Sequence, residues 1–311
     1  METSQWVLDV LDGGPEALDP PNASNRKGGV GWRNTVRVRI LHGRVKRRII
    51  KSLDRLDGAY SIDRDGLPIN QEDLAATLGS FSIAVLVSLQ RMGVNPTPQE
   101  REDFVALWRH IGFYMGIEPS ILQRCFQTAH AADQFLFSIV RHLFADLEED
   151  VKAGRETPPA PTMPVLRSVS DRPPFFVPKE AHCASSRHMI GSRLASALHI
   201  PPTPFKYVAL LQLTYVTVWY PVLFGTYWRS GWERSRRDLA RPLLRRLITW
   251  SMGLKISRFS GEGTSLEEKT LDQAEGQLLV RKWKLVMREM LLVTAVFCSI
   301  PIFAVWKVAS R

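Results

Sequence analysis

The sequence predicts an all-α fold, and three observations support that prediction. Apolar residues recur at helical spacing between Asn34 and Leu53. Two later segments begin with helix-capping boxes, one at Asn70 and one at Thr97. Between the two boxes, Leu74–Met92 is apolar on nearly every side, as expected for a helix that is buried on most of its faces.

The first predicted helix, Asn34–Leu53, has an apolar stripe on one side and a strongly basic surface elsewhere. The stripe consists of Val38, Leu41, Val45, Ile49 and Leu53. His42 falls inside this stripe, whereas most of the arginines fall off it. The strict alternation of valine and arginine at positions 36–39 leaves an extended start to the segment open.

The next helices are predicted from their start signals. Asn70 is followed three residues later by Asp73, and Thr97 is followed by Pro98 and Glu100. The inner face of the second of these helices is expected to contain Phe104, Leu107, Trp108, Ile111 and Met115. A third helix is predicted over Pro119–Val151.

Residues 155–180 contain seven prolines and predict a linker or long arm that is extended in places. A further helix is expected over Ser185–Leu198, before another proline-rich turn at 201–204.

Two C-terminal stretches are long and apolar enough to consider as membrane segments. Tyr207–Trp228 has 22 residues without a charge, and Met290–Trp306 has 17 residues close to the end of the chain. The basic segment between them favours a layout in which only Met290–Trp306 spans the membrane, as a C-terminal anchor after a polar linker at 256–289. Tyr207–Trp228 would then be a buried or interface-lying helix, and the basic stretch would face anionic lipid. A layout with two spans stays open.

Composition limits the partners. The 311 residues have a net charge of +10, which suggests anionic partners. Nucleic acid is the weakest of these, since no zinc-finger spacing, aromatic RNA-binding strand or basic heptad pattern occurs. Three separated cysteines and an N-terminus without secretory character predict a main domain in the cytosol.

The sequence contains few motifs that indicate a particular chemical activity. The sequence lacks nucleotide-binding glycine fingerprints, the GxSxG nucleophile motif and the HExxH zinc motif. A zinc site at His182, Cys183 and His188 is disfavoured because no further ligand lies near in sequence. On residue pattern alone, His42 is either a satisfied core histidine or a metal ligand whose neighbouring guanidinium groups suit the propionates of a haem.

Three segments in order resemble one family. They are "WRNTVRVRILHGRVKRRI", "GLPINQEDLAATLGSFS" and "LQRMGVNPTPQEREDFVALWRHIGFYMGI". Together they resemble the rubber oxygenase (latex-clearing protein) family and its relative, the ER-bound oxygenase of mycophenolic acid biosynthesis. The resemblance is good over about residues 3–150 and loose through about 255.

The resemblance implies a globin-like helical bundle around haem b, with a membrane-associated C-terminal region, at the endoplasmic reticulum. It implies cleavage of a carbon–carbon double bond by O₂ in a hydrophobic, prenylated substrate. The catalytic domain would occupy residues 1–255.

The resemblance also assigns site residues. His42 matches the family's proximal iron ligand, and Thr3 can be matched to its distal threonine. Arg39 and Trp108 are predicted to line the haem pocket. Glu2 stands where the family has a basic residue before that threonine, and the family's other distal groups would fall before Met1. The alternative prediction is therefore a non-catalytic, membrane-associated paralogue.

Overall fold

The structure is a computed structural model that describes residues 2–53, 60–152, 162–172 and 175–220, together with residues 223, 224, 245, 248 and 288. All regular secondary structure in these residues is helical, which confirms the all-α prediction. The elements are α1 (Glu2–Leu11), a 3₁₀ turn (Pro15–Leu18), α2 (Val30–Lys51), α3 (Ile62–Asp65), α4 (Gln71–Phe81), α5 (Ile83–Arg91), α6 (Pro98–Met115), α7 (Pro119–Phe126), α8 (Ala129–Lys152), α9 (Thr162–Val169), α10 (Lys179–Ile190), α11 (Ser192–Ala197), α12 (Phe205–Thr214) and a π turn (Tyr215–Trp219).

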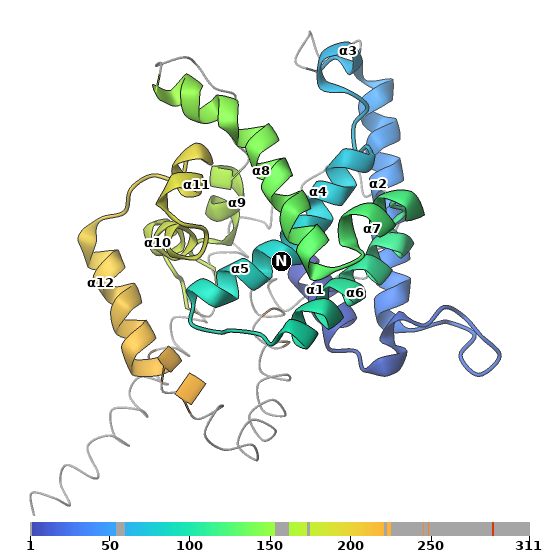
Figure 1. Cartoon of the computed structure of the whole chain (residues 1–311), viewed down its shortest axis with the longest axis horizontal. Helices are drawn as coiled ribbons and strands as arrows, with labels where there is room; N and C mark the ends of the chain where they lie inside the picture. The colour runs from blue at the N-terminus through green and yellow to red at the C-terminus, as the bar shows by residue number, and fades with distance from the viewer. Residues whose placement is uncertain are drawn as a thin grey trace, which may run out of the picture.

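The helices form two groups around two apolar cores. Figure 1 shows α1 near the centre of the larger group, α2 along the right-hand side and α9–α12 gathered on the left. The larger core draws buried side chains from α1, α4, α5, α6, α7 and α8, and it includes Trp108, Ile111 and Phe126. The smaller core is built around Cys183, Ala195 and Ile200.

Helix α2 begins at Val30, four residues before the predicted start, and positions 36–39 are helical rather than extended. Its apolar stripe is less buried than predicted. Val38 packs against the main core, but Leu41 and Val45 remain 43% and 40% exposed. The physical reason is that the beginning of α2 packs against α1 and α6, while the described helices leave its later turns partly open.

Both predicted capping boxes are confirmed. The Asp73 N–H donates to Asn70 Oδ1 at 2.9 Å, and the Asn70 N–H donates to the Asp73 carboxylate at 3.0 Å. Thr97 and Glu100 exchange the equivalent pair of bonds at the start of α6. These bonds satisfy backbone N–H groups that have no partner within the helix.

The single helix predicted through Leu74–Met92 is wrong, because Ser82 interrupts it. Ser82 has φ −100° and ψ −85°, and its fully buried hydroxyl donates to the Leu78 carbonyl at 2.8 Å. A serine hydroxyl that bonds back to the preceding turn bends a helix. The result is α4 and α5, and the latter leaves Val85 and Val87 partly exposed rather than buried.

Other predicted boundaries also change. The helix expected over Pro119–Val151 is divided into α7 and α8. The proline-rich arm contains a helix, α9. Pro164 is compatible with it because it lies in the first turn, where a missing N–H is tolerated. The helix expected over Ser185–Leu198 starts earlier and breaks at Gly191, which has φ +88° and separates α10 from α11.

Within the described residues, one helical stretch, Gln71–Arg91, has the length and hydropathy to cross a membrane. It comprises α4 and α5, and Leu78 and Leu86 of this stretch belong to the main core. The linker predicted at 256–289, apart from residue 288, and the anchor predicted at Met290–Trp306 lie outside the described residues.

Two helical glycines provide a test of the packing. A Cβ at Gly112 in α6 would lie 2.8 Å from Leu78 Cδ2 and 3.0 Å from Leu122 Cδ2, whereas a Cβ at Gly43 in α2 would meet nothing within 4 Å. We expect Gly112→Ala to lower the free energy of unfolding by about 1–3 kcal/mol through overpacking. The control Gly43→Ala should raise it by about 0.5–1 kcal/mol, since alanine favours the helix. Denaturant titration followed by circular dichroism measures both, and equal effects would contradict the packing.

Candidate functional site

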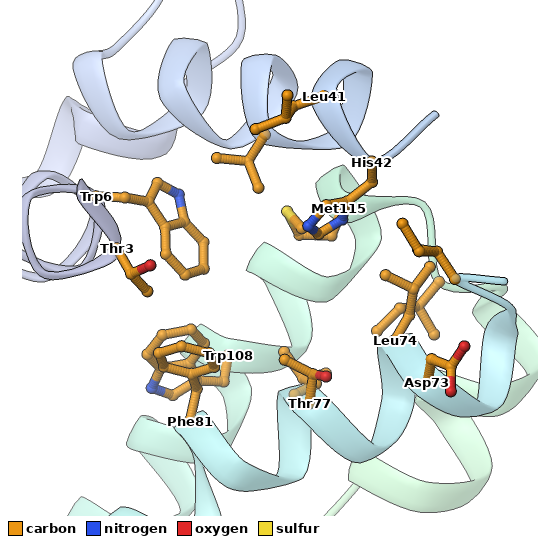
Figure 2. Close-up of a pocket in the computed structure, with 14 residues that line it drawn as sticks. Thr3, Trp6, Leu41, His42, Asp73, Leu74, Thr77, Phe81, Trp108 and Met115 are labelled. Atoms are coloured by element: carbon orange, nitrogen blue, oxygen red, sulfur yellow. The ribbon is translucent and has the colours of Figure 1, made fainter. Parts of the chain in front are cut away.

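A cavity of about 500 Å³ lies between α1, α2, α4 and α6, and its wall is largely apolar. The lining residues are Thr3, Trp6, Val38, Leu41, His42, Ile69, Asp73, Leu74, Thr77, Leu78, Phe81, Trp108, Met115 and Ile117. Figure 2 shows His42 projecting from α2 into this space, with Thr3 and Trp6 at the other end of it. Volumes of this order are typical of sites that hold small molecules and cofactors.

His42 is a polar group in an apolar wall. Its Nδ1 atom is buried and has no hydrogen-bond partner. Burial also lowers the pKa of His42 below its ordinary value of 6.5, because the charged form loses its hydration. His42 is therefore a neutral imidazole near pH 7, and neutral imidazole is the form that binds metals.

Three aromatic side chains from separate helices form one wall of the cavity. Phe81 stacks on Trp108 with ring centroids 5.3 Å apart and an interplanar angle of 25°. Trp6 meets both rings edge-on, at 5.6 Å from Phe81 and 5.9 Å from Trp108. This geometry matches the preferred offset and edge-to-face arrangements of aromatic rings, and it holds α1, α4 and α6 together at the cavity.

Trp6 is fixed by a buried polar contact. Its Nε1 donates to Thr35 Oγ1 at 3.1 Å, and the Thr35 hydroxyl donates to the Gly31 carbonyl at 2.7 Å. Thr3 lies one turn before Trp6 on α1, so the same anchor positions it. Although Thr3 is exposed on its outer side, it lines the cavity together with His42.

The cavity also contains a carboxylate, that of Asp73, which sequence reasoning treated only as a capping residue. One of its oxygens accepts the Asn70 N–H at the start of α4. The hydroxyl of Thr77, one turn further along α4, lines the same space. Polar residues are thus few in a mainly apolar lining, and Asp73 and Thr77 are also exposed.

Arg39 does not line the cavity. It is exposed, and its Nη1 lies 3.5 Å from the Tyr114 carbonyl. Its guanidinium covers Gly116, where a Cβ would lie 2.8 Å from Arg39 Nε. Gly116 has φ +93° and ends α6, so the backbone favours glycine there.

Of the four residues singled out from the sequence, the structure brings Thr3, His42 and Trp108 to one cavity. Sequence reasoning missed Trp6, Phe81, Thr77 and Met115. Phe81 is the last residue but one of the second resembling segment, and Trp6 follows Thr3 at helical spacing, so both had a local signal. The contact between Phe81 and Trp6 had no signal in the sequence.

The three residues of the disfavoured zinc site, His182, Cys183 and His188, do not line the cavity. Cys183 is buried in the smaller core, and buried ring nitrogens of His182 and His188 have no hydrogen-bond partner. Across the part of the chain that the structure describes, no three or more metal-ligating side chains gather.

An all-helical bundle with an imidazole and an aromatic wall around an apolar cavity is a scaffold suited to a buried cofactor. Residues 1–219 match the family described as "ER-bound oxygenase mpaB/B'/Rubber oxygenase, catalytic domain". The chain belongs to this family, and these residues form its oxygenase catalytic domain. Searches of curated proteins and of solved structures found no match.

The lowered pKa of His42 predicts a pH dependence of stability. The unfolded chain takes up a proton at a higher pH than the folded chain, so the free energy of unfolding falls as pH drops below about 6.5. His182 acts in the same direction, since burial lowers its pKa as well. We therefore expect His42→Gln to reduce, without abolishing, the loss between pH 7 and pH 5.

Denaturant titrations of the cofactor-free protein at several pH values measure this difference. His142→Gln, at an exposed site on α8, is the matched control and should follow the wild-type curve. A His42→Gln curve parallel to wild type would show that the imidazole is not buried in solution.

Proposed function

We propose that this protein is a haem b-dependent oxygenase that cleaves a carbon–carbon double bond of a hydrophobic, prenylated substrate. The observation that carries the proposal is the buried Nδ1 of His42, which has no hydrogen-bond partner in an apolar cavity. A buried polar atom without a partner costs roughly 1–3 kcal/mol. Coordination of iron by the imidazole would give this costly arrangement a function.

The described residues fit such a group. His42 is held neutral by burial, so it needs no deprotonation before it binds iron. The aromatic wall and the aliphatic lining give the space a mainly apolar surface. When bound, haem supplies the O₂ chemistry, while the protein supplies position, polarity and access.

Two further residues have proposed roles. Thr3 lines the cavity at the other end from His42, and its hydroxyl would donate a hydrogen bond to a ligand held there. Arg39 lies almost one turn before His42 on α2 and would pair with a haem propionate. This pairing requires its guanidinium to leave the Tyr114 carbonyl, to which it is held only by a long contact.

The lining supports an apolar substrate, because side chains such as Leu74, Leu78 and Ile117 offer contact area but no charge. The family description places its members at the endoplasmic reticulum. We propose the same membrane for this protein, with the main domain in the cytosol. A substrate of this kind partitions into the bilayer, so an enzyme at the membrane meets it at high concentration.

The ligand assignment is tested by absorption spectroscopy. Protein purified with haem should show a Soret band, and His42→Ala should lose most of it because the imidazole that would hold the iron is gone. Added imidazole should restore the band by occupying the vacated position. His142→Ala is the control and should keep the band. Failure of wild type to bind haem, or an unchanged band in His42→Ala, would refute the assignment.

The role of Thr3 separates an active enzyme from the non-catalytic paralogue. Thr3→Val should keep the Soret band and lower kcat for O₂ consumption with a prenylated substrate by about a hundredfold, as expected for loss of one donor at a reacting centre. Haem-loaded wild type that consumes no O₂ with any prenylated compound offered would support the non-catalytic alternative.

A further inference from the structure

Helix α12 combines an apolar surface with high exposure. Between Phe205 and Tyr220 the one charged residue is Lys206, next to the start of the helix. Phe205 is 83% exposed, and Leu210 and Val216 are 54% and 61% exposed. A helix that is apolar all round is normally enclosed by protein or lipid, and apolar surface of this extent marks an interaction site.

One stripe of the helix is packed against the protein. It consists of Tyr207, Leu211, Tyr215 and Trp219, which recur every four residues and are less exposed than their neighbours. Tyr215 is buried against His188 of α10, with ring centroids 4.8 Å apart. Trp219 Nε1 donates to the Met92 carbonyl just after α5 at 2.7 Å. The helix is therefore held along its length, and its remaining circumference faces outward (Figure 1).

Lipid is the occupant that suits this surface. A partner helix would cover a narrow stripe, whereas the exposed apolar residues of α12, among them Leu210, Leu213 and Val216, spread over a broad outward arc. The flanking charge is also complementary to a membrane, since residues 229–246 contain seven arginines against two acidic residues. Basic segments beside an inserted helix are attracted to anionic headgroups.

We propose that α12 and the π turn after it insert shallowly into a lipid bilayer, with the stripe from Tyr207 to Trp219 remaining on the protein. The described geometry opposes a full span of this segment. Its packed stripe lies along α10, which carries Lys179, Glu180 and Arg187 and would be carried into the hydrocarbon with it. Interfacial helices bury one face about 5–10 Å deep, and that depth keeps α10 in water.

This surface is separate from the cavity and does not depend on haem. It gives the protein a membrane contact within the family domain, in addition to any anchor at Met290–Trp306. Failure to bind haem would therefore not refute the membrane insertion of α12. Failure of α12 to insert would likewise not refute haem binding.

A local probe tests the proposal in the full chain. Leu210→Cys is labelled with an environment-sensitive fluorophore in a Cys298→Ser background and reconstituted with phosphatidylcholine–phosphatidylserine vesicles, with and without brominated acyl chains. Ile40→Cys is the matched control, because Ile40 is also an exposed apolar residue but belongs to α2, which lies on the opposite side of Figure 1 from α12. The Cys298→Ser parent reports labelling at the remaining cysteines.

We expect the label at position 210 to shift its emission to shorter wavelength and to be quenched severalfold more by brominated lipid than the label at position 40. Equal quenching at both positions, or a water-like spectrum at 210, would overturn the proposal. A blue shift at 210 that appears without lipid and grows with protein concentration would also overturn it, by showing that a second copy covers the helix.

Discussion

The cavity depends on the contact between α1 and α2, which includes a buried polar pair, and on the partners of Asp9. Asn34 Nδ2 donates to Asp9 Oδ2 at 2.8 Å, and Arg245 Nη1 lies 3.0 Å from Asp9 Oδ1. Asp9 is 5% exposed, so these partners offset the loss of its hydration. The helices approach so closely that a Cβ at Gly31 would lie 2.9 Å from the Asp9 carbonyl. Without this contact Trp6 would not close the aromatic wall.

The contact between α1 and α2 also explains the environment of His42 in the cavity. Once α1 closes one side, His42 faces a mainly apolar space, and partial burial lowers its pKa because the charged form loses hydration. Its unpartnered nitrogen has no compensating bond within the protein. A core histidine with a purely structural role normally has its buried nitrogens satisfied. The arrangement is costly for stability and suited to binding, a combination found at functional sites.

Local features of this fold could be predicted from sequence, and features set by tertiary contact could not. The boxes at Asn70 and Thr97 involve residues three apart, so their sequence signal is complete. The inward position of His42 followed from periodicity. The break at Ser82 depends on a rotamer choice within a buried turn, and the meeting of Trp6 with Trp108 depends on how three helices pack. Neither feature can be recognised from the spacing of residues in the sequence.

Exposure was the hardest property to predict. Leu41 and Val45 fit the apolar stripe of α2 as well as Val38 does, yet they are only partly covered. Periodicity identifies which face of a helix is apolar but not what lies against it. The same limit applies to α12, whose composition could not distinguish a core helix from one that meets lipid.

The break at Ser82 has a consequence for the path of the substrate. Helix α5 starts immediately after Phe81 and Ser82, at the cavity wall, and ends next to Met92, which holds Trp219. Its nine residues correspond to a length of about 14 Å. With α12 in lipid as proposed, the two ends of α5 mark the bilayer surface and the cavity. The prenyl tail of the proposed substrate would then bridge that interval while its head stayed among the phospholipids.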